Sequence, residues 1–175
     1  MDSSELDELE RKQGKNATIS ATPRFYKVVT ESGSGVLYAD PDCEVFLLDH
    51  KEDDTAIGSA ILAALTKSRF VTDEELRSVF KSRMQEIEEK AEQSARLRVK
   101  RYAYKSRTQM NKETKYVNVR LSEGQMTFMP NHTRASGIYD GLSKDQHVVI
   151  PGHSPPSDIG AAFRLALSRC TSKYD

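Results

Sequence analysis

Two segments of the chain carry small and apolar residues at the spacing of an amphipathic helix, residues 55–68 and residues 155–170. In the second segment the apolar positions are Ile159, Ala162, Phe163, Ala166, Leu167 and Cys170. Such positions share one face, because a helix turns once every three to four residues. When the two segments are aligned, their apolar positions match and Gly58 aligns with Gly160. We predict two similar helices whose glycines allow close packing against a sheet or against each other.

A third, longer helix is predicted to begin after Thr72. Glu75 follows this threonine three residues later, a spacing typical of a capping box. An apolar stripe continues beyond it through Leu76, Val79, Phe80, Met84, Ile87 and Ala91. No glycine or proline interrupts the pattern before Tyr102, so one uninterrupted helix is expected.

Short apolar or alternating runs predict strands in the rest of the chain. These runs are residues 25–30, 36–39, 45–48, 116–121, 125–129 and 147–151. A turn at Ser122-Glu123-Gly124 is predicted to join the run 116–121 to the run 125–129 as a hairpin. The run 45–48 is continuously apolar, which predicts a strand buried on both faces. In the last run, Val148, Val149 and Ile150 are likewise expected to be buried. Residues 131–144 are predicted to form a loop. The pattern as a whole predicts a single α+β domain, a twisted and mostly antiparallel sheet with packed helices.

The first part of the chain has the weakest pattern. Residues 1–23 are polar, and residues 14–22 resemble a linker. We expect a weakly held N-terminal arm over residues 1–23 and one folded domain over residues 24–175.

Composition excludes several classes of protein. The chain has 175 residues, with 26 Lys and Arg against 26 Asp and Glu, so its formal net charge is zero. This balance argues against a general nucleic-acid binder and against a protein attracted to anionic membranes. The two cysteines, Cys43 and Cys170, are not in a C-x-x-C motif and are expected to be reduced thiols. No secretion signal or membrane-spanning apolar run is present, so a cytoplasmic location without membrane contact is expected.

Charge is nevertheless segregated along the sequence. Acidic residues gather at Asp40, Asp42, Glu44, Asp49, Glu52, Asp53 and Asp54. They lack the spacing of a calcium-binding loop, and we interpret them as a solvated acidic edge. The segment 96–120 is basic and contains Lys100, Arg101, Lys105 and Arg107. Arginines with nearby tyrosines can bind phosphates and stack bases, so a small RNA-binding protein using this segment is the alternative function.

No arrangement of residues indicates catalysis. The four histidines lack the partners of a dedicated metal site, and the chain has no nucleophile-elbow, Walker or dinucleotide-binding motif. We therefore expect no enzyme activity, no metal, no cofactor and no small-molecule substrate.

Several motifs together resemble one known family. They are I-G-x-A-I-L-x-A-L-x-K-S-R-F at 57–70, Y-K-S-R at 104–107, M-P-x-H at 129–132, V-V-I-P at 148–151 and D-I-G-A-A-F-R-L-A-L-S-R-C at 158–170. The chain is similar over residues 25–170 to a family of immunity proteins of contact-dependent growth inhibition (CdiI).

This resemblance implies a small bacterial cytoplasmic protein that binds the C-terminal toxin domain of its cognate CdiA and blocks it, without catalysis of its own. Many such toxins are nucleases, so inhibition of a nuclease is expected. For a basic nuclease, the acidic residues from Asp40 to Asp54 are the complementary surface, with Tyr38 and Tyr139 as aromatic anchors. The basic segment would instead serve an acidic toxin surface.

Overall fold

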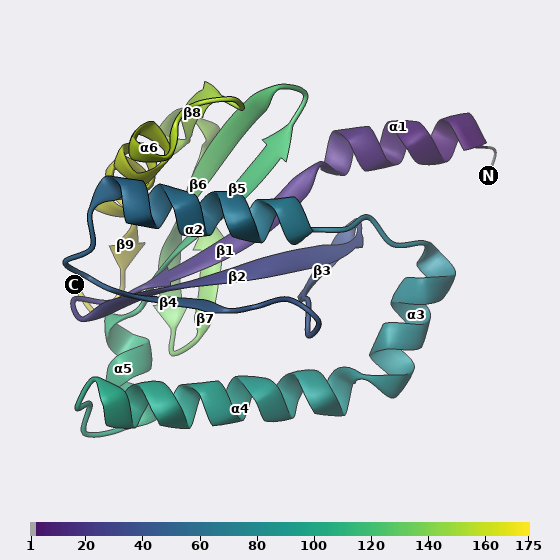
Figure 1. Ribbon diagram of the computed structural model, residues 1–175. Coiled ribbons are helices and arrows are strands. Elements are labelled where there is room, and N and C mark those ends of the chain that lie inside the picture. The colour runs from purple at the N-terminus through teal and green to yellow at the C-terminus, as the bar shows by residue number, and fades with distance from the viewer. Residues whose placement is uncertain (1–2) are drawn as a thin grey trace.

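The computed structural model describes residues 3–175, which form a curled sheet with helices on both faces (Figure 1). The helices are α1 (Ser3–Gln13), α2 (Asp54–Lys67), α3 (Asp73–Ser82), α4 (Met84–Arg101), α5 (Arg107–Glu113) and α6 (Pro156–Arg169), with a 3-10 turn, η1 (Lys144–Gln146). The strands are β1 (Lys15–Ala21), β2 (Phe25–Ser34), β3 (Val36–Ala39), β4 (Phe46–Asp49), β5 (Lys115–Ser122), β6 (Gln125–Ala135), β7 (Ile138–Gly141), β8 (Val148–Pro151) and β9 (Thr171–Ser172).

The sheet has the strand order β3-β2-β1-β5-β6-β7. The start of β2 also pairs with β4, and β6 also pairs with β8 and β9. Every pairing between these strands is antiparallel except that of β6 with β9. The prediction of an α+β fold with a mostly antiparallel sheet is confirmed.

The main core lies between one face of the sheet and the helices α2 and α6. Ile19, Val28, Val117 and Phe128 point from the strands into this core, and none of them is exposed. The two predicted similar helices are present, and they lie side by side over this face (Figure 1). Their glycines lie in the contact between the helices, which explains the matching positions in the sequence.

The prediction of a loose N-terminal arm is wrong for residues 15–21. This segment is β1, a central strand that pairs with β2 on one side and β5 on the other. Its apolar positions, Ala17, Ile19 and Ala21, alternate with polar ones, but alanine carries little hydrophobic signal. The segment becomes a strand because two partner strands satisfy its backbone groups on both sides.

The predicted long helix is divided at Arg83. The Thr72 hydroxyl accepts a hydrogen bond from the backbone N–H of Glu75 at 3.2 Å, which confirms the predicted start. However, α3 ends at Ser82, and α4 leaves in a new direction (Figure 1). The Arg83 guanidinium binds both carboxylate oxygens of Asp42 at 2.8 Å, in the loop after β3. This long-range ion pair fixes the change of direction between α3 and α4. No local sequence pattern predicts it.

Three further predictions need correction. Residues 131–144 are mostly strand rather than loop, because β6 continues to Ala135 and pairs with β7. The run 45–48 is not buried on both faces: β4 is half-buried, and Val45 is exposed. The last predicted strand is also buried on one face only, since Val148 is buried while Val149 is exposed.

Helix α4 lies across the second face of the sheet. Its C-terminal half packs through Ala95 on Phe25, with Tyr104 and Met110 completing a small apolar cluster. Its N-terminal half is held by the loop after β3, where Lys90 donates to the carbonyl oxygen of Pro41 at 2.8 Å. The helix is therefore supported at both ends over a polar face of the sheet.

Candidate functional site

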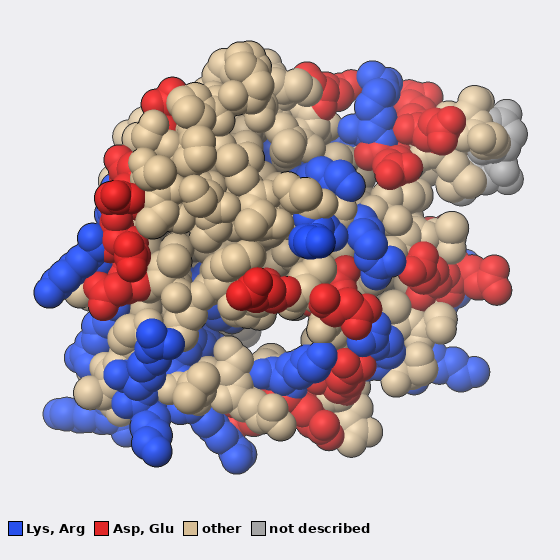
Figure 2. Space-filling model, in the orientation of Figure 1, with Lys and Arg blue, Asp and Glu red and all other residues tan. Residues whose placement is uncertain are grey.

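The acidic residues expected to form one edge fall into two groups at opposite ends of β4. Asp40, Asp42 and Glu44 precede this strand, and Asp49 to Asp54 end it or follow it. Figure 2 shows acidic side chains along the edge of the molecule where α2 begins. The second group is the one at this edge, so a single continuous acidic surface from Asp40 to Asp54 is not formed.

In the first group, Asp40 is an internal structural residue. Its carboxylate accepts hydrogen bonds from the Ser32 hydroxyl at 2.6 Å and from the backbone N–H of Asp42 at 3.0 Å. Arg69 lies 3.4 Å from the same carboxylate, and the residue is only 4% exposed. Asp40 is therefore not available to a partner, whereas Glu44 is exposed.

In the second group, Asp49, Glu52 and Asp53 are exposed, while Asp53 and Asp54 also make contacts at the start of α2. Asp53 caps α2 by accepting from the backbone N–H of Ala56 at 2.8 Å, and Asp54 pairs with Arg164 Nε at 2.6 Å. The accessible negative charge at this edge thus comes mainly from Asp49 and Glu52, with Asp53 beside them.

The two tyrosines expected as anchors differ in environment. Tyr38 is 7% exposed and packs with Val71 and Val79, so its prediction as a surface anchor is wrong. Tyr139 is half-buried, and its ring stacks on Tyr116 with the centroids 4.1 Å apart. Tyr139 therefore belongs to the polar face of the sheet and not to an acidic group.

The basic residues of the alternative surface are all exposed. Lys100 and Arg101 end α4, Lys105 lies in the following loop, and Arg107 begins α5. Arg107 is paired with Glu92, and the Arg101 guanidinium lies 5.5 Å from the ring of Tyr102. Part of this positive charge is therefore already engaged within the protein.

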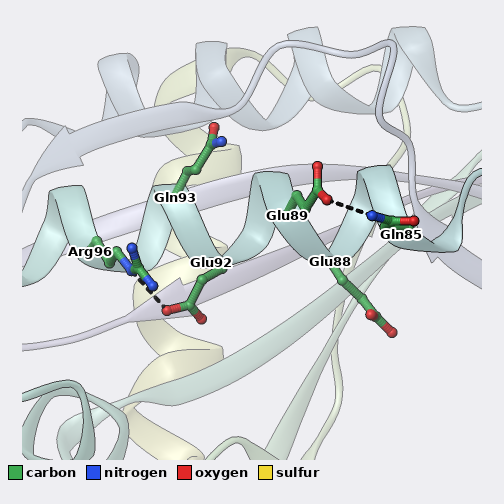
Figure 3. A pocket seen from close by; sticks show the side chains of 6 residues that line it. All are labelled: Gln85, Glu88, Glu89, Glu92, Gln93 and Arg96. Atoms are coloured by element: carbon green, nitrogen blue, oxygen red, sulfur yellow. Dashed lines mark hydrogen bonds and ion pairs between the residues drawn. The ribbon is translucent and has the colours of Figure 1, made fainter.

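One flank of α4 carries a stripe of polar side chains (Figure 3). Its members are Gln85, Glu88, Glu89, Glu92, Gln93 and Arg96. Gln85 donates to Glu89 at 2.9 Å and Arg96 to Glu92 at 3.1 Å, as expected for pairs one turn apart. The close-up shows side chains spread along the helix rather than converging on one point, so this stripe is a solvated surface.

A groove lies between α4 and the sheet. It encloses a cavity of about 120 Å³ between β2, the end of β3 with the loop that follows it, and the middle of α4. The lining residues are Lys27, Val29, Ala39, Asp40, Pro41, Cys43, Val45, Ile87, Lys90, Ala91 and Ser94. Figure 2 shows an opening between α4 and the main body of the protein. The groove is thus an internal surface that is accessible from outside.

Ionisable groups on this face of the sheet have shifted pKa values. Burial, together with the nearby cations Arg98 and Arg107, lowers the pKa of Lys27 to about 8. On the same strand, burial raises the pKa of Glu31, partly offset by a hydrogen bond from Thr18. Shifts of this kind indicate a poorly solvated polar face that residue patterns alone do not reveal.

Sequence reasoning missed Lys27 and Arg98 as functional candidates. Lys27 lies inside a predicted strand, and Arg98 continues the inner stripe of α4, where an apolar residue is expected. The position of Arg98, a charged residue on an otherwise apolar helix face, is the sequence feature that could have identified it as a candidate.

In the described residues, no helix is long and apolar enough to cross a membrane. Within the same part of the chain, no three His, Cys, Asp or Glu side chains are grouped as metal ligands would be. Cys43 and Cys170 are both free thiols.

Comparison with known proteins gives consistent matches over most of the chain. Residues 15–170 match the family model described as "CdiI: CDI immunity protein". The immunity protein CdiI-YPIII of Yersinia pseudotuberculosis serotype O:3 (strain YPIII) is 28% identical over 168 residues, covering 88% of this chain and 94% of that protein.

Two solved structures share the fold. A Neisseria meningitidis protein described as of unknown function aligns with a TM-score of 0.81 and 25% identity, covering 91% of this chain and 97% of that one. A chain from a CdiA-CT/CdiI toxin and immunity complex of Yersinia pseudotuberculosis aligns with a TM-score of 0.78 and 23% identity, covering 90% and 97% of the two chains.

Proposed function

This chain belongs to the CdiI family of CDI immunity proteins, and we propose that it binds and neutralises the C-terminal toxin domain of its cognate CdiA protein. The observation that carries this proposal is the family match, which extends from the start of β1 to the end of α6. It therefore includes both helices over the core and the whole of α4. A related chain is named as part of a toxin and immunity complex, which supports the same type of partner here.

Neutralisation by binding needs high affinity. A dissociation constant near nanomolar corresponds to about 12 kcal/mol, which an interface of about 1,600 Å² can provide when charges match and a few side chains are deeply buried. This function requires a complementary surface and no reactive centre, in keeping with the absence of a catalytic motif in the sequence.

The accessible carboxylates Asp49, Glu52 and Asp53 form the outer part of the proposed interface. They are exposed and lie together at the end of β4 and in the loop after it. Such a surface suits a basic partner, and nucleases are commonly basic where they contact nucleic acid. We propose a nuclease toxin for this reason, and the cytoplasm as the place of action because that is where a nuclease meets its substrate.

The experiment is a rescue assay with the toxin domain encoded beside this gene. Expression of the toxin domain alone should stop growth, and co-expression of this chain should restore it. The two proteins should also co-purify as a stable complex. Failure of both rescue and co-purification would refute the proposed function.

A further inference from the structure

Two cations lie on the inner side of α4 without an acidic partner. Lys27 lies on β2 and lines the groove, while Arg98 on α4 is 8% exposed. In residues 3–175 neither side chain makes an ion pair, and Lys27 Nζ makes no hydrogen bond. Buried charges in proteins are normally paired, because removing an ion from water costs several kcal/mol. Two unpaired cations between α4 and the same face of the sheet are therefore unusual.

The surroundings of Arg98 show how it is held. Its Nε donates to the carbonyl oxygen of Ser94 at 3.2 Å, and its guanidinium carbon lies 5.6 Å from the centroid of the Phe25 ring. In the described part of the chain neither Nη nitrogen has a hydrogen-bond partner. Ser94 lines the groove, so the Arg98 guanidinium lies next to the groove. Its two Nη nitrogens remain available as hydrogen-bond donors.

The sheet places Lys27 and Tyr116 in one row. Ser20 on β1 pairs with Lys27 on β2 and with Tyr116 on β5, so the three side chains point to the same face of the sheet. Phe25 points to the same face as Lys27, two residues away along β2, and the Arg98 guanidinium carbon lies 5.6 Å from the centroid of the Phe25 ring. Arg98 also contributes to the lowered pKa of Lys27. An ammonium group, a guanidinium group and a phenol therefore lie on the same face of the sheet.

The other charged side chains that line the groove, Asp40 and Lys90, are already engaged. Asp40 is bound by Ser32, by a backbone N–H and by Arg69, and Lys90 is paired with Glu86 and with a backbone carbonyl. Arg107, the other cation that influences Lys27, is paired with Glu92. Lys27 and Arg98 are thus the cations that remain to be neutralised.

We propose that Lys27 and Arg98 form a binding site for a carboxylate and that an aspartate or glutamate side chain of the toxin domain occupies it. This inference rests on the proposed function and names the group recognised. A cavity of about 120 Å³ admits one side chain, whereas pockets for small-molecule ligands begin at about 300 Å³. An extended RNA strand needs a longer groove with stacking platforms for successive bases, so a protein carboxylate is the better occupant.

The test is calorimetric titration of the full chain with the purified toxin domain encoded beside it. Lys27→Met and Arg98→Met keep much of each side chain's volume and remove the charge. Each should weaken binding at least about 30-fold, because the toxin carboxylate would then be buried without a cation. Lys27→Arg and Arg98→Lys, which retain the charge, should recover part of the affinity. Lys81→Met is the matched control, since Lys81 is exposed on the neighbouring helix α3, and it should bind within about threefold of the original chain.

A second readout separates direct pairing from altered structure. Lys27 is partly neutral at pH about 8 in the free protein, and a bound carboxylate would favour its charged form. The original chain should therefore take up more protons on binding than the Lys27→Met variant, measured as a difference in heat between two buffers. Melting curves should show that Lys27→Met folds at least as stably as the original chain.

The outcomes are distinguishable. If the original chain does not bind the toxin domain, the proposed function itself is refuted. If it binds, and the methionine variants bind equally well with equal proton uptake, only the carboxylate site is refuted. If Lys27→Met instead abolishes binding to a single-stranded RNA oligonucleotide and leaves toxin affinity unchanged, the cations serve nucleic acid and the inference is overturned.

Discussion

Gly58 and Gly160 occupy equivalent positions in α2 and α6, and each lies against the first turn of the other helix. A Cβ atom on Gly58 would lie 1.8 Å from the carbonyl oxygen of Pro156, and one on Gly160 would lie 2.0 Å from that of Asp54. The contact is therefore reciprocal, with each glycine facing the first residue of the other helix. The two helices that cover the core can approach this closely only because both positions lack a side chain.

Replacing either glycine by alanine is expected to destabilise the protein. The added methyl group would meet backbone atoms, which cannot rotate away, so the helices must separate at a cost of about 1–3 kcal/mol. Gly58→Ala and Gly160→Ala should both lower the denaturant midpoint. Ser59→Ala, on the exposed side of α2, is the control and should have little effect. Normal stability in both glycine variants would contradict the close contact.

Asp40 is expected to act on stability rather than on toxin binding. Asp40→Asn would place an amide donor among the Ser32 hydroxyl, the backbone N–H of Asp42 and Arg69, all of which now donate to it. We expect a loss of about 1–3 kcal/mol in the free energy of unfolding, measured by urea denaturation. Glu44→Gln, at an exposed nearby carboxylate, should leave stability within about 0.5 kcal/mol of the original.

Reversing the charges of Asp49 and Glu52 is expected to slow association with a basic toxin. Exposed charges at the rim of an interface act mainly on the association rate, so the double lysine variant should associate about tenfold more slowly at low salt. The difference should shrink as salt rises. Glu8→Lys on α1, far from this edge in Figure 1, is the control. An unchanged association rate would remove this loop from the proposed interface.

Lys27 is expected to make stability depend on pH. Because its pKa is lowered from 10.5 to about 8 in the folded protein, the unfolded chain holds more protons between these values. Stability must therefore rise with pH across this window, and the penalty is fully present below about pH 8. Between pH about 7 and 9.5, the original chain should gain about 1–2 kcal/mol relative to Lys27→Met. Parallel pH profiles of the two proteins would show that Lys27 is not buried as a charge.

Arg83 is expected to hold α4 in place over the groove. It binds Asp42 in the loop after β3 and also contacts Glu86 at 2.9 Å, within the first turn of α4. Arg83→Ala should increase amide hydrogen exchange in residues 84–91 at least about threefold, because the N-terminal half of the helix loses this attachment. Arg96→Ala, which removes an ion pair within the helix, should leave exchange in the same residues unchanged.

The parts of the fold that sequence reasoning predicted are those set by neighbouring residues. The capping of α3 by Thr72 depends on a residue three positions away, and the turn between β5 and β6 depends on Glu123 and Gly124, which both have positive φ angles. The two similar helices follow from apolar spacing within a single segment. Each of these patterns involves residues close together in the sequence, so it can be recognised without knowledge of the tertiary structure.

The burial of individual side chains, and their contacts with distant segments, could not be predicted from such local signals. The acidic residues from Asp40 to Asp54 look alike in sequence, yet Asp40 is internal while Glu52 is exposed, because β4 separates the two groups. Tyr38 is an aromatic residue of the kind that often anchors an interface, but in the folded protein it is covered by α3. Accessibility depends on what packs above a residue, and that is decided by distant segments.

By itself, the sequence determined the fold class, the two glycine-containing helices and the family resemblance, because these depend on local pattern and on residue order. The tertiary structure decided the central place of β1, the break at Arg83 and the burial of Lys27 and Arg98 between α4 and the sheet. Those features arise when segments far apart in the chain bury each other's surfaces and remove charges from water. The spacing of residues within one segment cannot predict this loss of solvation, because it occurs only after the fold has brought the two segments of each contact together.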